Sequence, residues 1–433
     1  MNLLNNDRQA QQIGEYKHYD RCRFCYSNKM APFIDFGNVP LAGGFIAKGA
    51  TQKNFKAERL FPLQICFCPN CNLVQINNVI GSDILFKNYF YFSSAIKTLS
   101  DHFVEYAKEL KQMFKHPKKT LIVEIGSNDG VFMKPLIKQG FNVVGIDPAT
   151  NVVQPLLKAG YQVLDAFFNE KVAKKVKIKF GQADAIVTSN SFAHIDDMHE
   201  VMHGVKTLLK NDGFLAIEVH YLGTLLNEVQ YDMMYHEHQS YYSLLALSNF
   251  FDMYDMEVYD IKQIPMHAGS MRYYVQNKNF GQRKVTTRAK KLLAVEQKMK
   301  LGNVTTYKKF SSYVNKTKKD LLKLLTKLKK EGKTIAGYGA SGRATALTSF
   351  CGLDEELLDY VVDDAPAKQG AFMPGSHLPI VASDILDDPK LRPDYCVVFA
   401  WSFINEIMKK KTLYIKNGGR FIIPLPEVKI VKK

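Results

Sequence analysis

The sequence predicts an α/β protein built from three folded units, and three patterns along its 433 residues point to this. Two closely spaced cysteine pairs lie near the N-terminus. A glycine-containing turn between an apolar run and a helical pattern occupies the middle of the chain, and a second turn of this kind lies near the C-terminus. Because one hydrophobic core rarely serves more than about 300 residues, a chain of this length is expected to divide into two to four domains.

The cysteine pairs Cys22–Cys25 and Cys68–Cys71 have the C-x2-C spacing of zinc knuckles, with 42 residues between them. Four thiolates can hold one Zn²⁺ in a tetrahedral site, which leaves no coordination position open for catalysis. We therefore expect a small zinc-binding domain over residues 1–80, in which a structural metal supplies much of the folding free energy. Cys66 is a spare thiol that leaves the ligand set slightly ambiguous, and a set of free cysteines is the alternative interpretation.

Residues 121–130 read LIVEIGSNDG, an apolar run suited to a buried parallel strand, followed by a glycine turn. Glycine lets the backbone of such a turn approach a ligand closely. A second strand, FNVVGID, ends at Asp147, where a carboxylate can bind both hydroxyls of a ribose. The turn lacks the G-x-G-x-x-G pattern of a dinucleotide site, so S-adenosylmethionine, which has no pyrophosphate, fits it better. The residues expected to bind this methyl donor are Glu124, Gly126, Ser127, Asn128, Gly130, Asp147 and Asn190.

Two later strands extend the same pattern. ADAIVTSNS ends near Asn190 and His194, and GFLAIEVH ends at His220. Ligands of open α/β sheets bind at the carboxyl ends of the strands, so polar residues in these positions support a binding site along that edge.

Residues 334–344, TIAGYGASGRA, place three glycines, with Gly339 in the middle, in a G-x-G-x-x-G pattern between a short strand and a helix. A further strand ends at Asp363, and the turn-rich loop after it carries Lys368. Backbone N–H groups at a helix start, with a cation nearby, can bind a pyrophosphate. These features suit NAD and a nucleotide-diphosphate sugar equally, and they predict a second Rossmann-like domain over residues 333–433.

The net charge of +16 is concentrated in one segment. From Arg283 to Lys333 the chain has 17 Lys or Arg residues and three acidic residues, which amounts to +14. Leucines at 321, 322, 325 and 328 recur at helical spacing, so we expect a helical connector over residues 281–332 with a solvated basic face; an anionic partner is the alternative. No apolar run has the ~18–20 residues of a membrane helix, and the N-terminus lacks a signal-peptide pattern, so a cytoplasmic protein without a membrane partner is expected.

In this order the motifs resemble those of the sugar C-methyltransferases that act on nucleotide-linked 4-keto-deoxysugars. Besides the cysteine pairs, the motifs are YFYFSS (89–94), VEIGSNDG (123–130), NSFAHIDD (190–197), YHEHQSYYS (235–243), HAGSMRYY (267–274), GYGASGR (337–343) and DDAPAKQGAFMPGSHLPI (363–380). The family implies a zinc domain, a central class I S-adenosylmethionine methyltransferase domain over residues 81–280 and a C-terminal Rossmann-like domain for the nucleotide sugar. It also implies methyl transfer to carbon 3 in deoxysugar biosynthesis. Ala268 departs from the family's H-G-G-S loop, which has glycine there.

The motif formed by His236, Glu237 and His238, here called the HEH motif, suits the chemistry that the resemblance implies. A carbon next to a ketone becomes nucleophilic only after a general base removes its proton, and the enolate oxygen then needs hydrogen-bond donors. By resemblance, His238 is the base, and Glu237 orients it or binds a sugar hydroxyl. The further catalytic candidates, as donors to the enolate oxygen or neighbours of the sugar, are Tyr235, Tyr89 or Tyr91, and His194. The residues implied to contact the substrate elsewhere are Tyr241, His267, Arg272, Gly339, Lys368 and His377.

Other functions stay open on the sequence alone. Zinc at His236 and His238 is disfavoured, because metalloproteases use H-E-x-x-H to bring two histidines to one helical face, and a polar loop without function is the plain alternative. A sugar O- or N-methyltransferase would need weaker base assistance. A zinc-ribbon RNA methyltransferase would account for the knuckles and the basic segment, but no stretch alternates aromatic residues with Lys or Arg as nucleic-acid grooves do. We expect a monomer without a nucleic-acid partner.

Overall fold

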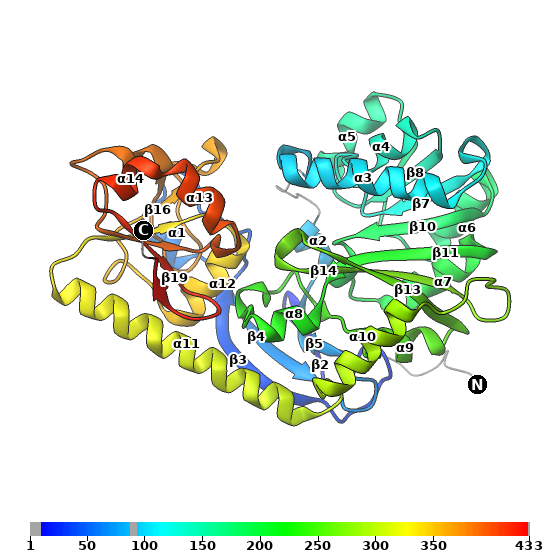
Figure 1. Cartoon of the computed structure of the whole chain (residues 1–433), viewed down its shortest axis with the longest axis horizontal. Coiled ribbons are helices and arrows are strands. Elements are labelled where there is room, and N and C mark those ends of the chain that lie inside the picture. Colours follow the sequence, from blue (N-terminus) through cyan, green and yellow to red (C-terminus); the bar gives the residue numbers. More distant parts are fainter. Residues whose placement is uncertain (1–9, 87–92, 432–433) are drawn as a thin grey trace.

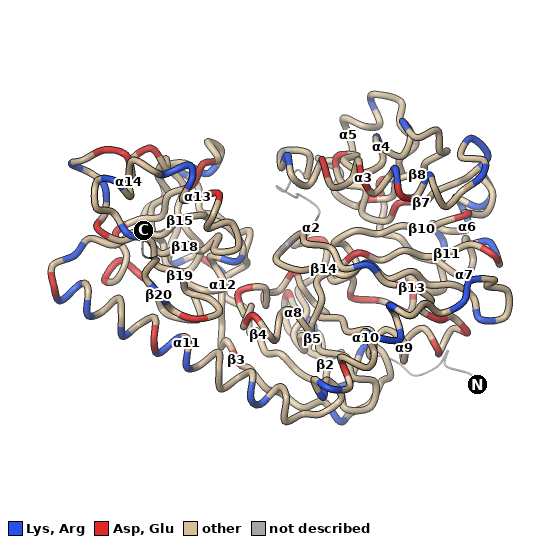
Figure 2. The backbone as a smooth tube through the Cα atoms, viewed as in Figure 1, with Lys and Arg blue, Asp and Glu red and all other residues tan. Residues whose placement is uncertain are grey.

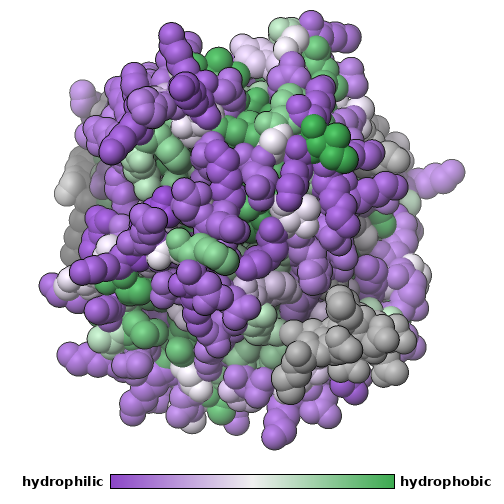
Figure 3. All heavy atoms as spheres, turned by 90° about the vertical axis from the view of Figure 1, so that its right-hand side faces the viewer, coloured by the Kyte–Doolittle hydropathy of each residue, from purple (hydrophilic) through white to green (hydrophobic). Residues whose placement is uncertain are grey.

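The structure, a computed structural model, describes residues 10–86 and 93–431, and four β-sheets form within these ranges (Figure 1). Strands and helices mix throughout, as the α/β prediction requires. In the described part of the chain, no helix combines the length and the apolar composition of a membrane span. On the face that the central domain presents in Figure 3, hydrophobic side chains form small groups among hydrophilic ones.

Two antiparallel sheets build the N-terminal region. One has the order β1-β2-β6 and the other the order β12-β5-β4-β3. The fourth strand of the second sheet comes from far along the chain, since β12 pairs with β5. The elements of this region are β1 (Ala10–Ile13), β2 (Tyr16–Tyr19), β3 (Ala31–Pro40), α1 (Gln52–Lys56), β4 (Leu60–Phe67), β5 (Val74–Ile76), β6 (Asn78–Ile80), α2 (Ser82–Phe86) and β12 (Ser240–Tyr241).

The central sheet has seven strands in the order β13-β14-β11-β10-β7-β8-β9. The strands from β11 to β9 are parallel to one another, whereas β14 is antiparallel to both of its neighbours. All five residues of β7 are buried, which explains why four of them are apolar; Glu124 is the fifth. The strands are β7 (Leu121–Ile125), β8 (Asn142–Asp147), β9 (Val163–Asp165), β10 (Ala183–Ser189), β11 (Leu209–His220), β13 (Met256–Ile264) and β14 (Ser270–Asn277).

Helices cover both faces of the central sheet. Leu99, Leu136 and Leu156 on three helices pack against one face, and Val172 and Val201 on two others pack against the opposite face. This two-sided cover is typical of doubly wound α/β domains. The helices are α3 (Lys97–Met113), α4 (Met133–Lys138), α5 (Thr150–Lys158), α6 (Glu170–Phe180), α7 (Met198–Leu208), α8 (Leu222–Asn227) and α9 (Leu244–Asp252).

The C-terminal sheet has the order β17-β16-β15-β18-β19-β20, in which only the last pair is antiparallel. This is the strand order of a Rossmann-like domain, as predicted. The elements are β15 (Ile335–Tyr338), α12 (Gly342–Cys351), β16 (Val361–Asp363), β17 (Ile380–Ala382), β18 (Tyr395–Val398), α13 (Ile404–Lys410), α14 (Thr412–Lys416), β19 (Arg420–Ile423) and β20 (Lys429–Ile430).

The basic segment forms α10 (Thr287–Lys298) and the long α11 (Val304–Lys330), which runs beneath the N-terminal sheet toward the C-terminal domain (Figure 1). The Lys residues of α11 recur along the length of the helix (Figure 2). The buried side of α11 belongs to one hydrophobic core together with Ile65 of β4 and Val397 of β18. The N-terminal sheet and the C-terminal domain therefore share a core through this helix.

A buried ion network crosses the central sheet. Arg272 of β14 lies directly opposite Glu218 of β11, and its Nε and Nη2 donate to Oε2 of this carboxylate at 2.9 and 2.7 Å. Its Nη1 lies 3.0 Å from Glu109, and its guanidinium carbon lies 3.1 Å from the centre of the Tyr106 ring. Burial alone would raise the pKa of Glu218, but the hydrogen bond from His102 and the charge of Arg272 outweigh it and lower the pKa. With its guanidinium engaged in this way, Arg272 serves the fold, and its position does not support the expected substrate contact.

We predict that Arg272→Leu lowers the free energy of unfolding by about 3–5 kcal/mol, because Glu218 would be left as a buried charge without its partner. Lys262→Ala is the matched control: Lys262 pairs with Glu109 of the same network from a side chain that is 41% exposed, so its loss should change stability by less than about 1 kcal/mol. Urea unfolding measures both. If Arg272→Leu kept full stability and raised the KM for the acceptor, the residue would be a substrate contact after all.

Candidate functional site

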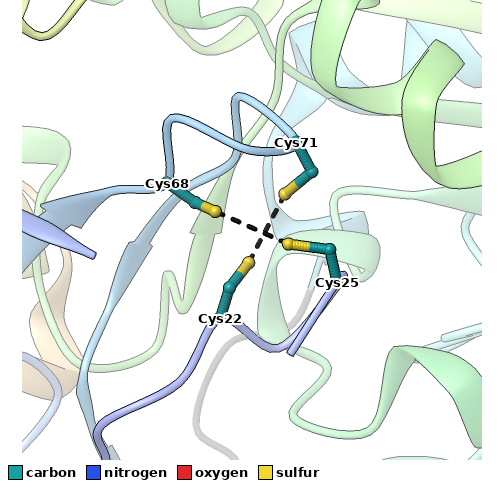
Figure 4. A group of neighbouring side chains, drawn as sticks. All are labelled: Cys22, Cys25, Cys68 and Cys71. Carbon is teal, nitrogen blue, oxygen red and sulfur yellow. Dashed lines mark hydrogen bonds between the residues drawn. The ribbon is translucent and has the colours of Figure 1, made fainter. Parts of the chain in front are cut away.

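The four predicted zinc ligands converge on one point (Figure 4). Their Sγ atoms lie within 4.8 Å of one another, with 3.4 Å between Cys22 and Cys71 and 3.6 Å between Cys25 and Cys68. Four sulfur atoms about 2.3 Å from a tetrahedral Zn²⁺ would be ~3.8 Å apart, so the group fits the metal. Cys66 is buried in β4 outside this group of four sulfur atoms, so it is not one of the four ligands.

The glycine turn after β7 is shaped for a ligand at the carboxyl edge of the central sheet. Gly126 has a φ of +78°, and a Cβ there would lie 1.9 Å from Oγ of Ser191, so only glycine fits. Asp147, at the end of β8, accepts hydrogen bonds from the backbone N–H groups of Asn128 and Ala149, both at 2.9 Å. A carboxylate has further lone pairs, so Asp147 can still accept two hydroxyl groups.

Buried polar atoms without partners gather at the same edge. Within the described residues, Oε2 of Glu124, Oγ of Ser189 and Oδ1 of Asn190 have no hydrogen-bond partner. Burial, followed by the charges of Asp147 and Asp129, raises the pKa of Glu124 well above its usual range. Such unpaired atoms call for a polar ligand, which fits the predicted methyl donor.

Two residues of the predicted donor site have other roles in the turn. The side chain of Ser127 is fully buried, and a Cβ on Gly145 would lie 2.8 Å from its Oγ, so it faces the sheet and only its backbone borders the turn. Gly130 has a φ of +78° and packs near Leu156, which makes it a turn residue. The turn is also tied to the segment before α3, because the backbone N–H of Ser93 donates to Oδ1 of Asn128 at 3.1 Å.

Residues 231–243, the HEH loop, bring His238 into a cluster of rings. The His238 ring is buried, and its Nδ1 lies 2.7 Å from the carbonyl oxygen of Met233. Because a carbonyl can only accept, Nδ1 carries a proton, and in the neutral imidazole the lone pair is therefore on Nε2. The ring centres of Tyr235, His220 and His194 lie 4.1, 4.7 and 5.3 Å away. The structure thus brings together three residues that the sequence indicated, His238, Tyr235 and His194.

His220 was noted on the sequence only as a strand end, and its position beside His238 was missed. The signal was present: it ends β11, next to β10, which His194 follows. Burial lowers the pKa of His194 to about 4, so this imidazole is neutral at cellular pH.

The two histidines of the HEH loop point in different directions, as their spacing predicted. Nε2 of His236 lies 3.3 Å from the carbonyl oxygen of Pro62, and burial lowers the pKa of His236 to about 4. His236 therefore packs against the N-terminal sheet. Glu237 lies near Gly43, where a Cβ would be 3.5 Å from its Oε1. Among the described residues, the four cysteines are the only group of three or more His, Cys, Asp or Glu placed to hold a metal.

The C-terminal domain holds the start of the HEH loop. Asp232 is fully buried, and its Oδ2 accepts hydrogen bonds from Nε of Arg343 and from the indole N–H of Trp401, both at 2.9 Å. Burial raises the pKa of Asp232, and the charge of Arg343 opposes this. The ring of Tyr235 lies against Gly342, where a Cβ would be 3.5 Å from its Cζ. The last glycine and the arginine of the C-terminal turn thus contact the loop that carries His238.

The remainder of the C-terminal turn has the same hydrogen-bond pattern as the glycine turn of the central domain. Asp363, at the end of β16, accepts from the backbone N–H groups of Ala340 and Ala365, both at 2.8 Å. Nζ of Lys368 donates to the carbonyl of Ala340 at 2.5 Å, and Gly339 has a φ of +97°. Gly339 and Lys368 therefore lie together, as the sequence predicted for an anion site.

Two predicted substrate contacts lie in structural positions. His377 stacks on Phe55, with 4.3 Å between ring centres, and its Nε2 lies 2.8 Å from Glu58, so it joins the C-terminal loop to the N-terminal region. Tyr241 is buried in β12 as part of the hydrophobic core. Both residues therefore have packing contacts, and their contact with the substrate stays a prediction.

Three further predictions fall where little is described. Tyr89 and Tyr91 lie outside the described residues, and so does the side chain of His267.

At the departure from the family motif, Ala268 has a φ of +62° and Gly269 one of +112°. Alanine is strained in this region by roughly 1–2 kcal/mol, which explains why glycine is the family's residue there.

We predict that Cys25→Ser removes the bound zinc, because it deletes one of four thiolates, whereas Cys66→Ser keeps it. Metal analysis of the purified proteins should give about one zinc per chain for the wild type and for Cys66→Ser. Thermal unfolding should show a large loss of stability for Cys25→Ser alone. Loss of zinc from Cys66→Ser instead would overturn the ligand assignment.

We predict that Asp147→Asn weakens binding of S-adenosylmethionine by roughly tenfold or more, because the amide cannot accept from both turn N–H groups and two hydroxyls at once. Asp212→Asn is the control, since Asp212 is exposed within β11 near the opposite edge of the sheet. Isothermal titration calorimetry compares the two. Equal affinities would show that Asp147 only supports the turn.

Comparison with known proteins agrees with this arrangement. Three family models match the chain: "Putative zinc binding domain" at residues 22–86, "Methyltransferase domain" at 99–261 and "C-methyltransferase C-terminal domain" at 265–426. The C-methyltransferase NovU from Streptomyces niveus is 32% identical over 412 residues, which cover 95% of this chain and 97% of NovU. The similar solved structures include the plantazolicin methyltransferase BpumL in complex with SAH (14% identity, TM-score 0.33, 42% of this chain and 86% of that chain) and the mitomycin 7-O-methyltransferase MmcR (12%, 0.31, 40% and 53%).

The matches confirm the predicted order of a zinc-binding domain, a class I methyltransferase domain and a further C-terminal domain, and the cofactors S-adenosylmethionine and zinc. Identity of 32% along nearly the whole of both chains shows that this protein belongs to the family of S-adenosylmethionine-dependent C-methyltransferases.

Proposed function

We propose that this C-methyltransferase methylates carbon 3 of a 4-keto-6-deoxysugar linked to a nucleoside diphosphate, as a cytoplasmic step of deoxysugar biosynthesis. The base that prepares the carbon is His238. The observation that carries the proposal is the contact of 2.7 Å between Nδ1 of His238 and the carbonyl of Met233, which fixes Nδ1 as the protonated nitrogen and makes Nε2 the basic nitrogen of the neutral ring.

A sugar carbon needs such a base. The hydrogen at carbon 3 is acidic only because the neighbouring ketone can take up the electron pair as an enolate. Nε2 of His238 accepts this proton, the C–H bond breaks, and its electrons move toward the ketone oxygen. A buried imidazole with one nitrogen fixed as donor is prepared for this step, because it need not change its tautomer.

The developing oxygen anion needs donors, and the surroundings of His238 supply candidates. The centre of the Tyr235 ring lies 4.1 Å from that of the His238 ring, with the two planes tilted by 35°, and the ring of His194, kept neutral by burial, lies 5.3 Å away. A phenol and a neutral imidazole can each donate one hydrogen bond to the enolate oxygen. Glu237, whose Oε1 lies near Gly43, is the candidate acceptor for a sugar hydroxyl.

The bound S-adenosylmethionine would supply an electrophilic methyl group. The residues that would hold it are Asp147 and the glycine turn, at the carboxyl edge of the sheet where His220 ends β11 and His194 follows β10. The HEH loop and the donor site thus share one edge, which supports transfer from the donor to the enolate carbon without a large movement of either partner.

The C-terminal turn supports recognition of the nucleotide diphosphate. Lys368 and the start of α12 lie beside Gly339, and a pyrophosphate is stabilised by a helix N-terminus together with a cation. Arg343 is engaged by Asp232, so Lys368 is the cation that would serve. Lys368 would have to exchange its contacts with the Ala340 carbonyl and the Asp363 carboxylate for a phosphate oxygen.

We predict that His238→Asn lowers the rate of methyl transfer by roughly 10²- to 10⁴-fold and leaves the affinity for S-adenosylmethionine unchanged. The acceptors to be screened, with labelled donor, are dTDP-, GDP- and CDP-4-keto-6-deoxyhexoses. In heavy water with S-adenosylhomocysteine bound, the wild type should exchange deuterium into carbon 3 of the acceptor, and the variant should not.

His236→Asn is the matched control, because His236 belongs to the same motif but faces Pro62. It should reduce stability while keeping deuterium exchange. Methyl transfer by the wild type without any exchange at carbon 3 would favour an oxygen or nitrogen acceptor instead, and His238→Asn with the full rate would refute the base.

A further inference from the structure

The zinc knuckle at Cys22–Cys25 is inserted into the central domain. Its two middle residues, Arg23 and Phe24, are only 2% and 0% exposed. Phe24 stacks on Phe250 of α9 with 3.8 Å between ring centres, and its carbonyl oxygen lies 2.8 Å from Nε2 of His199 in α7. The knuckle therefore does more than close the N-terminal sheet, since its tip is part of the methyltransferase core.

The guanidinium of Arg23 reaches the residues that directly follow His238. Nη1 donates to Oε1 of Gln239 at 3.0 Å, and Nη2 donates to Oγ of Ser240 at 3.0 Å and to the carbonyl of Gln239. Its one acidic neighbour within ion-pair distance in the described residues is Asp196, at 3.7 Å. The guanidinium of Arg23 is thus hydrogen-bonded mainly to neutral oxygen atoms of the HEH loop, and these bonds fix the position of the loop relative to Arg23.

The other end of Arg23 is tied to a zinc ligand through Gln75. Oε1 of Gln75 accepts from the backbone N–H and Nε of Arg23 at 3.1 and 3.2 Å, and its Nε2 lies 3.1 Å from Sγ of Cys22. One chain of hydrogen bonds therefore runs from a metal thiolate to the residue next to the proposed base. Such partners of a metal ligand fix its orientation in metal sites generally.

Gln239 also connects to the edge that carries His194. Its backbone N–H donates to the carbonyl of Ala193 at 2.8 Å, and its carbonyl accepts from the N–H of Ile76 at 3.1 Å. A shift of Gln239 would therefore move His238 relative to His194. An imidazole displaced by ~1 Å from the reacting carbon can lose about 10²-fold in rate.

We propose that Arg23 is a positioning residue for the HEH loop, and that the zinc site, through Cys22 and Gln75, supplies the fixed point from which Arg23 acts. This rests on the proposed role of His238. Lysine cannot replace Arg23, because one ammonium cannot reach the side chain of Gln75 and the acceptors on Gln239 and Ser240 together.

The test is Arg23→Lys in the full-length, zinc-loaded protein. We expect about one zinc per chain and unchanged affinity for S-adenosylmethionine, with kcat and the rate of deuterium exchange at carbon 3 both reduced by roughly 10- to 100-fold, and KM for the nucleotide sugar changed much less. Arg21→Lys is the matched control: Arg21 is exposed, precedes the same ligand and should have no effect.

Ser240→Ala keeps the test decisive if Arg23→Lys fails to fold. It removes one acceptor of Arg23 without touching the knuckle, and it should lower the exchange rate by about three- to tenfold with zinc retained. Unchanged exchange in every folded variant would overturn the role of Arg23. Absence of exchange in the wild type itself would instead overturn the proposed function.

Discussion

Strand β12 has only two residues, Ser240 and Tyr241, yet its pairing with β5 decides where the HEH loop lies. Two residue pairs stabilise little alone, so the loop depends on side chains at both ends. Arg23 bonds the end of the loop and Arg343 bonds its start at Asp232. A buried guanidinium is stable only where its N–H groups have acceptors. Moving the loop would therefore leave the charges of Arg23 and Arg343 without their hydrogen-bond acceptors. This constraint holds His238 in place although it lies on a loop.

The two Rossmann-like units share one local arrangement of hydrogen bonds. In each, an acidic residue that ends the second strand, Asp147 or Asp363, accepts from an N–H of the glycine turn and from the N–H two residues further along. This arrangement fixes the turn before any ligand arrives. What differs is the surroundings: unpaired oxygen atoms such as Oε2 of Glu124 adjoin the first turn, and the cation of Lys368 adjoins the second. Oxygen acceptors suit ribose hydroxyls, whereas a cation suits phosphate.

The sequence was sufficient for features that are local or that follow from strand ends. The cysteine spacing and both glycine turns belong to this class, whereas His238 was indicated only by the family resemblance. It was insufficient wherever distant segments pair. Arg272 meets Glu218, 54 residues away, through the insertion of β14 beside β11, and His377 meets Glu58 across 319 residues. Arg23 belongs here too, because its acceptors on Gln239 lie 216 residues further along the chain.

Helix α11 shows why a concentrated positive charge does not require a nucleic acid. Phe310, Leu321 and Leu325 are buried in the core that the N-terminal sheet shares with the C-terminal domain. The lysines between them keep the opposite face in water, and an exposed pair such as Lys316 and Asp320 contributes little to stability. A helix with one face joining two domains needs a strongly polar opposite face, and lysine supplies it with good helix propensity. Because this core fixes the two flanking domains relative to each other, Arg23 from one and Arg343 from the other hold the HEH loop from a single rigid support.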